Sequence, residues 1–437
     1  MSGDARDKKG LEVRLLAVEL LKRVLEEKCT VNEAIERGPK LGTLESRDRA
    51  FLQLLLLTTF RHLGEIEAVL GGHLAKPLPR KSGTATTILW LGIAQLLFLD
   101  TPAHAAIDMA VRSAQADRNA THFSGVINAV LRKISTVGKE ALEKLDSARL
   151  NTPDWLWSRW ERAYGLENAR LIGQAHAHEP PLDIAVKNDP AVWAEKLGGI
   201  LLPMGQIRLR DGHAPIPELP GFAEGAWWVQ DAAAAIPVRL FGSLEGKTAL
   251  DLCAAPGGKT LQMCAAGATV TAVDVSPVRL QRLRENLQRT GLAAAILEGD
   301  VLDLGISDVF DAVLLDAPCS ATGTIRRHPE LPYLKTASQI GELQSLQRNM
   351  LSAAANRVVP GGKLVYCTCS LEPEEGEKQV GWFLAEHSDF ELCRTIVPEL
   401  PSEFVKPEGW IRTLSFMNVG EAQGLDGFFA AVLQRRG

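Results

Sequence analysis

Short apolar segments alternate with helical segments from Lys247 to the C-terminus, and this alternation constrains the fold more than any other feature of the 437-residue chain. Strands and helices in alternation are typical of a parallel, doubly wound sheet with helices on both faces. Strands are expected at residues 248–252, 269–274, 294–297, 312–315, 363–367 and 428–433. We therefore predict an α/β, Rossmann-like core over residues 236–437.

The first 150 residues have a helical pattern instead. Leu11, Leu15, Val18, Leu21 and Leu25 recur at spacings of three and four, which lays them on one face of a helix. This region, residues 1–150, is predicted to be an all-α bundle, with further helices at 46–70, 84–99, 104–116 and 124–134.

A third pattern occupies residues 151–235. Strands expected at 182–186 and 206–210 flank a helix at 190–197, and prolines and glycines are dense afterwards. We predict a small α+β linker subdomain here, with no side-chain chemistry that the sequence identifies.

Composition indicates an ordinary soluble globular protein, with 46% hydrophobic and 23% charged residues. The net charge of -5 is unevenly distributed, because residues 1–150 hold 22 Lys and Arg against 18 Asp and Glu. A modestly basic front region permits contact with a polyanion but does not require it.

The cysteine pattern points to reduced thiols. The seven cysteines include no CxxC pair, which argues against a disulfide framework and a zinc site: 29, 253, 264, 319, 367, 369 and 393. No signal peptide is visible, and the longest apolar run, 88–99, is too short to span a bilayer. We expect a cytoplasmic monomer without metal or membrane contact.

The first chemical motif is the small-residue loop from Asp251 to Thr260, which follows a predicted strand and precedes a helix. Such loops let a ligand approach the backbone and the helix N-terminus. Neither a Walker A loop nor a GxGxxG fingerprint is present, so the ligand need not be a polyphosphate.

Two further acids follow the next strands. Asp274 ends the second predicted strand at a spacing from Asp251 typical of an acid that binds a ribose, and its alternative role is a helix cap. Asp300 follows the third strand, where an adenine would lie. A ribose and an adenine without phosphate contacts indicate S-adenosylmethionine as the cofactor.

Two thiols follow two other strands. Cys319 lies in the segment Asp316-Ala-Pro-Cys-Ser-Ala-Thr-Gly323, and Cys369 lies in Thr368-Cys-Ser370. Methylation of carbon 5 of a pyrimidine needs a thiolate that adds to carbon 6, a nearby carboxyl group and a base that removes the carbon 5 proton. A free thiol has a pKa of about 8.5, so the nucleophile needs local activation. The alternative is a pair of buried cysteines without a chemical role.

These motifs resemble the RNA cytosine-C5 methyltransferase family, and within it the bacterial 16S ribosomal RNA type called RsmB, Sun or Fmu. The segments that carry the resemblance are 253–259, 316–323 with Arg326-Arg-His-Pro329, and 368–370. The helical region, with Arg47-Asp48-Arg49 and the segment 123–132, resembles the NusB-like RNA-binding domain.

The resemblance implies specific roles by position. Cys369 would be the nucleophile, Cys319 the thiol needed for proton removal and release, and Asp316 and Lys259 would lie at the reaction centre. The cofactor site would comprise Cys253, Ala254, Ala255, Pro256, Gly257, Gly258, Lys259, Asp274, Arg279, Asp300 and Asp316. Cys367 departs from the family pattern, and we interpret it as packing.

The implied reaction transfers methyl from S-adenosylmethionine to carbon 5 of a cytosine in 16S rRNA, which the family calls C967. The substrate would be naked RNA or an assembling small subunit. Alternatives are methylation of tRNA or another RNA, a DNA cytosine-C5 methyltransferase with Cys319 as nucleophile, and a non-catalytic RNA-binding assembly factor.

Overall fold

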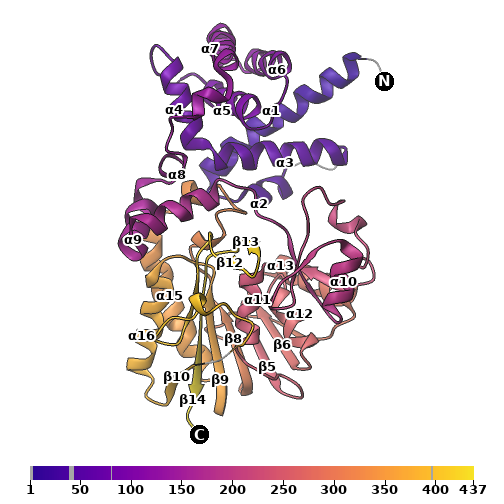
Figure 1. Cartoon of the computed structure of the whole chain (residues 1–437), viewed down its shortest axis with the longest axis vertical. Helices are drawn as coiled ribbons and strands as arrows, with labels where there is room; N and C mark the ends of the chain where they lie inside the picture. The colour runs from indigo at the N-terminus through magenta and orange to yellow at the C-terminus, as the bar shows by residue number, and fades with distance from the viewer. Residues whose placement is uncertain (1–2, 39–43, 80, 395–396) are drawn as a thin grey trace. The chain divides into compact units, whose positions relative to one another are not determined.

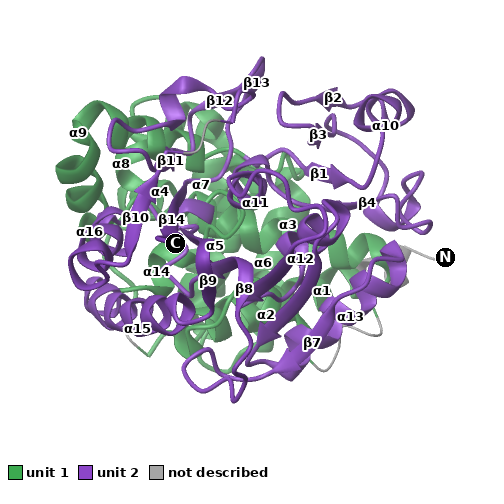
Figure 2. Cartoon of the chain, turned by 90° about the horizontal axis from the view of Figure 1, so that it is seen from below, with its two compact units in different colours: residues 1–178, 325–336 green, residues 179–324, 337–437 purple. Residues whose placement is uncertain are grey.

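The computed structural model describes residues 3–38, 44–79, 81–394 and 397–437 and divides into two compact units. Unit 1 comprises residues 1–178 and 325–336, and unit 2 comprises residues 179–324 and 337–437 (Figure 2). Because this division rests on packing, it does not follow the three ranges expected from sequence pattern, 1–150, 151–235 and 236–437, which stay a prediction. The two units are described separately.

Unit 1 is a helical bundle, as the sequence predicts. Apolar faces of its longer helices form one core, in which Leu20, Leu55 and Leu89 are fully buried. Its helices are α1 (Gly3–Glu27), α2 (Val31–Glu36), α3 (Ser46–Arg61), α4 (Leu63–His73), α5 (Ala85–Leu97), α6 (Ala103–Ala116), α7 (Ser124–Val137), α8 (Ser147–Leu150), α9 (Asp154–His176) and α14 (Leu331–Leu334).

The prediction of a single helix at residues 46–70 is wrong, because this range holds two helices, α3 and the greater part of α4. The break is at His62, whose φ of -113° and ψ of 19° are not helical. Its ring stacks on Phe98 with a centroid distance of 3.9 Å, and its Nδ1 lies 2.7 Å from Glu65. Apolar periodicity continues across the break, so the pattern gives no sign of it.

A twelve-residue segment from the middle of the chain completes unit 1. In this segment, residues 325–336, Leu334 packs into the core of the bundle. Glu330 is fully buried and accepts the backbone N–H of Val31 at 3.1 Å, and Trp155 Nε1 donates to the carbonyl of Pro332 at 3.3 Å. The chain thus passes directly from the Cys319 segment into the helical bundle and back.

Unit 2 begins with a small antiparallel sheet in the order β2-β3-β1-β4. Arg208 lies buried in it and forms a two-pronged ion pair with Asp183, at 2.7 and 2.9 Å. The elements are β1 (Asp183–Val186), α10 (Pro190–Leu197), β2 (Ile200–Leu201), β3 (Ile207–Arg208) and β4 (Trp227–Val229). The predicted α+β character of this region is confirmed.

The large sheet of unit 2 has the order β10-β14-β9-β8-β5-β6-β7, with β11 paired to β14 (Figure 1). All six predicted strands are present, with ends that differ from the predicted ones by at most five residues. The strands are β5 (Thr248–Leu252), β6 (Thr269–Asp274), β7 (Ala295–Glu298), β8 (Phe310–Asp316), β9 (Val358–Thr368), β10 (Phe390–Cys393), β11 (Ile411–Thr413) and β14 (Phe428–Arg435).

The prediction of a wholly parallel sheet is wrong at one edge. Strands β5 to β9 are parallel, but β14 is antiparallel to β9, β10 and β11. Parallel neighbours need a long crossover, usually a helix, and no helix separates β11 from β14. A hydrophobic run does not encode strand direction, so the sequence pattern gives no sign that β14 runs antiparallel to β9.

Side chains alternate between the two faces of the sheet. Ala312 and Leu314 pack with α11 and α12, whereas Val313 and Leu315 pack with α15 and α16. The helices that flank the sheet are α11 (Ala232–Arg239), α12 (Gly258–Ala265), α13 (Pro277–Thr290), α15 (Ala337–Ala355) and α16 (Glu377–Glu386). Strand order reverses between β5 and β8, and open α/β sheets bind ligands at the carboxyl ends of strands at such a point.

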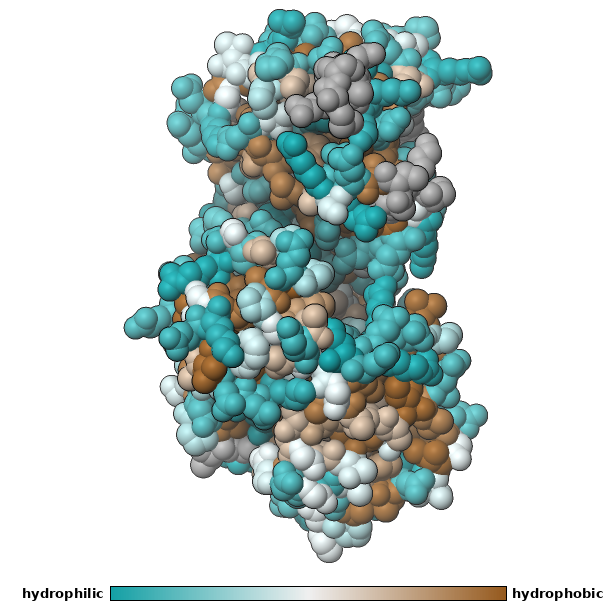
Figure 3. Space-filling view, turned by 90° about the vertical axis from the view of Figure 1, so that its right-hand side faces the viewer, coloured by the Kyte–Doolittle hydropathy of each residue, from teal (hydrophilic) through white to brown (hydrophobic). Residues whose placement is uncertain are grey.

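Hydrophilic residues cover much of the molecular face drawn in Figure 3, with smaller apolar areas between them. Within the described ranges, no helix has the length and apolar content needed to cross a bilayer.

Candidate active site

The small-residue loop connects β5 to α12 and has little room for side chains. Gly257 precedes α12 with a φ of +109°, and a Cβ built on it would lie 2.3 Å from Leu283 Cδ1 of α13. Only glycine fits this position. The loop backbone is therefore held close against α13, with the first N–H groups of α12 directed to the carboxyl edge of the sheet.

Asp274 organises one half of this edge. It ends β6, is 2% exposed, and accepts the N–H groups of Ala255 at 3.1 Å and Ser276 at 3.0 Å. Arg279 Nη1 lies 3.3 Å from its carboxylate, and the same guanidinium donates to the carbonyl of Ala255. The structure thus brings the loop, Asp274 and Arg279 together, as the resemblance implies.

Asp300 follows β7, the strand next to β6, and its side chain is exposed whereas that of Asp274 is buried. The N–H of Gly299 donates to the carbonyl of Asp274 at 3.2 Å, which places the end of β7 beside the end of β6. The Asp300 side chain is exposed and accepts the N–H of Leu302 at 2.9 Å. Two valines that the sequence reading missed, Val275 and Val278, are 67% and 68% exposed beside Asp274. An apolar residue directly after a strand-ending acid is the signal that points to Val275.

Asp251 is a buried acid under the loop. Its Oδ2 accepts the hydroxyl of Thr260 at 2.5 Å, and its Oδ1, also buried, has no hydrogen-bond partner among the described residues. Burial raises the pKa of Asp251 to about 7. Buried polar atoms are ordinarily hydrogen-bonded, so this oxygen is available to accept from a further donor.

Lys259 and Asp316 form an ion pair at the centre of the site. Lys259 Nζ lies 2.6 Å from Asp316 Oδ2 and 5.1 Å from the centroid of the Phe428 ring. Burial lowers the pKa of Lys259, but the Asp316 carboxylate outweighs it and leaves the pKa above its ordinary value. Lys259 is therefore a fixed positive charge, held by α12 beside the end of β8.

The two predicted thiols meet. Cys319 follows β8 and Cys369 follows β9, and their Sγ atoms are 3.5 Å apart. The N–H of Gly323 donates to the carbonyl of Cys369 at 2.9 Å, so the two loops are also joined through the backbone. The hydrogen bond with Cys369 and then burial raise the pKa of Cys319 well above its usual value.

Two further cysteines of the core, Cys367 and Cys253, also have raised pKa values. Cys367 is fully buried, its Sγ lies 3.5 Å from Asp316 Oδ1, and burial raises its pKa well above the ordinary value. Burial also raises the pKa of Cys253. Both environments disfavour a thiolate.

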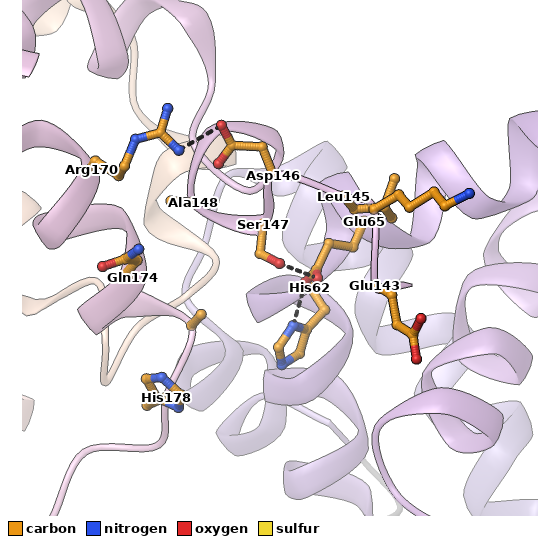
Figure 4. Close-up of a pocket in the computed structure, with 12 residues that line it drawn as sticks. His62, Glu65, Glu143, Leu145, Asp146, Ser147, Ala148, Arg170, Gln174 and His178 are labelled. Atoms are coloured by element: carbon orange, nitrogen blue, oxygen red, sulfur yellow. Dashed lines mark hydrogen bonds and ion pairs between the residues drawn. The ribbon is translucent and has the colours of Figure 1, made fainter. Parts of the chain in front are cut away.

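A large cavity lies in unit 1 and contains none of these residues. It measures about 930 Å³, and Figure 4 shows the ion pair of Arg170 with Asp146 and the hydrogen bonds of Ser147 and His62 to Glu65. These polar groups are paired with one another, and no cysteine lines the cavity. In the part of the chain that the structure describes, no group of three His, Cys, Asp or Glu side chains is arranged to hold a metal.

Comparison with known proteins shows which family the sequence matches. Residues 240–434 match the family model described as 16S rRNA methyltransferase RsmB/F, and residues 11–136 match the NusB family. The chain is 34% identical to ribosomal RNA small subunit methyltransferase B of Cronobacter sakazakii over 98% of its own length and 100% of that protein. It is 35% identical to the protein of that description from Klebsiella pneumoniae, with coverage of 98% and 99%.

The chain belongs to the RsmB/F family of 16S rRNA methyltransferases. It is therefore an S-adenosylmethionine-dependent enzyme of ribosomal RNA with a NusB-type helical region. Among solved structures, the crystal structure of PH0851 is 25% identical and superposes with a TM-score of 0.75 over 98% of both chains. NSun6 from Pyrococcus horikoshii, solved with SFG, has a TM-score of 0.56 at 20% identity and covers 65% of this chain and 98% of its own. The latter likeness shows the fold alone.

Proposed function

We propose that this enzyme methylates carbon 5 of one cytosine in 16S rRNA, at the position the family calls C967, through a covalent bond between Cys369 and carbon 6. The observation that carries the proposal is the pair of thiols 3.5 Å apart, beside the Lys259–Asp316 ion pair. Methylation of an amino group would need no thiol. Carbon 5 of a pyrimidine is not nucleophilic until a thiolate has added to carbon 6.

The cofactor site that we propose fits S-adenosylmethionine. Asp274 presents a carboxylate at a strand end for the ribose hydroxyls, Val275 offers an exposed apolar surface for the adenine, and Asp251 Oδ1 is a buried acceptor without a described partner. The remaining positions are residues 253–259, Arg279, Asp300 and Asp316. When bound, the cofactor supplies an electrophilic methyl group.

The first chemical step is attack on the ring. The Cys369 thiolate adds to carbon 6, and the electron pair of the ring double bond moves to carbon 5, which becomes nucleophilic. Asp316 hydrogen-bonds the Watson–Crick edge of the cytosine, because a carboxylate pairs with the cytosine amino group. The Lys259 ammonium offsets the negative charge that the thiolate brings to the ring.

The second step restores the ring. After methylation, the Cys319 thiolate takes the proton from carbon 5, the double bond forms again, and Cys369 leaves as a thiolate. The hydrogen bond with Cys369 is the main cause of the raised pKa of Cys319. Once Cys369 has become a thioether it is uncharged, so we expect Cys319 to release its own proton more readily at this stage than in the free enzyme.

The substrate is presented as single-stranded RNA. A cytosine inside a helix does not expose carbon 6, so the target base is splayed into the site at an energetic cost. We propose that the helical unit binds the flanking RNA, either naked or in an assembling small subunit, and that the enzyme acts as a monomer. A DNA cytosine-C5 methyltransferase would use Cys319 as the nucleophile, and a non-catalytic assembly factor would need neither thiol.

The substrate assignment is tested by mapping 5-methylcytosine in RNA from cells with and without the protein. We expect one cytosine of 16S rRNA to lose its methyl group in the deletion strain and to regain it with the wild-type gene. Loss of methylation from a tRNA, with 16S rRNA unchanged, would replace the proposed substrate.

A further inference from the structure

One buried carboxylate joins the two loops that carry the thiols. Ser320 follows Cys319 and Ser370 follows Cys369, and both serines are at most 1% exposed. Glu375, in the short turn before α16, is fully buried and contacts both serines. Each thiol is therefore next in sequence to a serine that hydrogen-bonds Glu375.

The hydrogen bonds to Glu375 come from both loops and from α15. The N–H of Ser320 donates to the two carboxylate oxygens at 2.9 and 3.2 Å, and its hydroxyl donates to Oε2. The hydroxyl of Ser370 donates to Oε2 at 2.6 Å. Gln347 Nε2 donates to Oε1 at 3.1 Å and also to the carbonyl of Pro318 at 2.9 Å.

The backbone of Glu375 adds a further connection to β9. Its carbonyl accepts the hydroxyls of Tyr366 at 2.8 Å and Thr368 at 3.2 Å. The residue therefore fixes the strand that leads to Cys369 as well as the turn that follows Cys319.

The charge of this residue is not explained by packing. Among the described residues no Lys, Arg or His forms an ion pair with Glu375, so neutral donors alone solvate a fully buried carboxylate. Burying a charge in this way is costly, and a neutral side chain of the same size would avoid that cost. Glutamine would not replace it, because its amide NH2 would face at least two donors in either orientation.

We propose that Glu375 is a positioning residue of the methylation reaction, which holds the Cys319 and Cys369 loops at one fixed spacing so that both thiols meet the same cytosine. This inference rests on the proposed function, because it assigns the two thiols to successive steps on one base. Glu375 itself touches neither the substrate nor the cofactor in this scheme.

An electrostatic effect accompanies the positioning. The charged and titratable groups that face Cys319 are Cys369, Glu375 and Tyr366. The negative charge of Glu375 contributes to the raised pKa of Cys319. Removal of that charge therefore lowers the pH at which Cys319 becomes a thiolate.

The test compares Glu375→Gln with Glu374→Gln in the full-length protein. Glu374 is the neighbouring residue and pairs with Lys378 at 2.8 Å near the surface, so it is a matched control. Glu375→Gln should lower kcat about 100-fold, the loss typical of reacting groups misplaced by about 1 Å, with the affinities for S-adenosylmethionine and RNA unchanged within about twofold. Glu374→Gln should keep the wild-type kcat.

A second measurement needs no RNA and separates this inference from the proposed function. The rate of Cys319 alkylation by iodoacetamide, read by peptide mass spectrometry across pH, should have its midpoint at lower pH in Glu375→Gln than in the wild type and Glu374→Gln. A purely structural role would not move this midpoint in a folded protein. If Glu375→Gln does not fold, Ser320→Ala and Ser370→Ala remove one hydroxyl donor each, and each should lower kcat about 10-fold.

Three outcomes would overturn the inference. The first is a wild-type kcat in Glu375→Gln, or in both serine variants. The second is an unchanged alkylation midpoint of Cys319. The third is an equal loss of cofactor affinity and kcat in Glu375→Gln.

Discussion

Replacement of Asp274 by asparagine tests the cofactor site in isolation. Asp274 accepts two backbone N–H groups and pairs with Arg279. Asparagine keeps the shape but loses the charge and half of the acceptor capacity. A hydrogen bond from a ribose hydroxyl to a charged group contributes about 1.5–3 kcal/mol, so the Kd for S-adenosylmethionine should rise about 10- to 100-fold.

The assay is isothermal titration of the cofactor together with filter binding of RNA. RNA affinity should change by less than about twofold, because no proposed RNA contact involves Asp274. The matched control is Asp311→Asn at the opposite end of the sheet, where the carboxylate accepts the N–H of Thr248 at 2.9 Å and its hydroxyl at 2.8 Å. This control removes comparable bonds and should leave cofactor affinity unchanged. An unchanged Kd in Asp274→Asn, or equal losses of cofactor and RNA affinity, would refute the reasoning.

Two other predictions concern buried groups. Cys367→Ala should keep kcat within about twofold and lower the free energy of unfolding by about 1 kcal/mol in urea titrations, because the thiol is interpreted as packing; loss of the RNA adduct in this variant would contradict that interpretation. The pKa of Asp251 is raised from 3.8 to about 7 in the folded protein, so stability present below about pH 4 should be lost as pH rises to 7, by up to about 4 kcal/mol. Asp251→Asn should flatten this part of the pH profile of unfolding without cofactor, and an unchanged slope would show that Asp251 ionises normally.

The sequence predicted the strands of the core well because each contains a short apolar segment and is separated from the next by a helical or turn pattern. The ends of α13 follow local rules: Ser276 accepts the N–H of Arg279, Pro277 begins the helix, and Gly291 ends it in the left-handed region. The direction of β14 could not be predicted, because its apolar pattern is the same as that of the parallel strands of the sheet. The direction follows from the connection before it, which carries no crossover helix.

The residue types of the candidate site could be predicted from sequence motifs. The hydrogen bonds that hold its loops in place could not. Motif spacing placed Cys319 and Cys369 at the ends of different strands, and the adjacency of β8 and β9 brings them together. The burial of Glu375 and its contacts with both thiol loops were not predictable, because a Glu two residues after a Pro in a turn is ordinarily exposed. The insertion of residues 325–336 into the helical bundle was also hidden, since it depends on contacts with segments about 300 positions away, such as that of Glu330 with Val31.

The order of the two thiols is the central claim, and adduct formation tests it most directly. Each cysteine is replaced by alanine, and the variant is incubated with cofactor and 16S rRNA and then resolved under denaturing conditions. We predict that Cys369→Ala forms no covalent protein–RNA complex and no 5-methylcytosine. Cys319→Ala should accumulate the complex without turnover, because the methylated adduct cannot lose its proton. An adduct in Cys369→Ala and none in Cys319→Ala would contradict the account and make Cys319 the nucleophile.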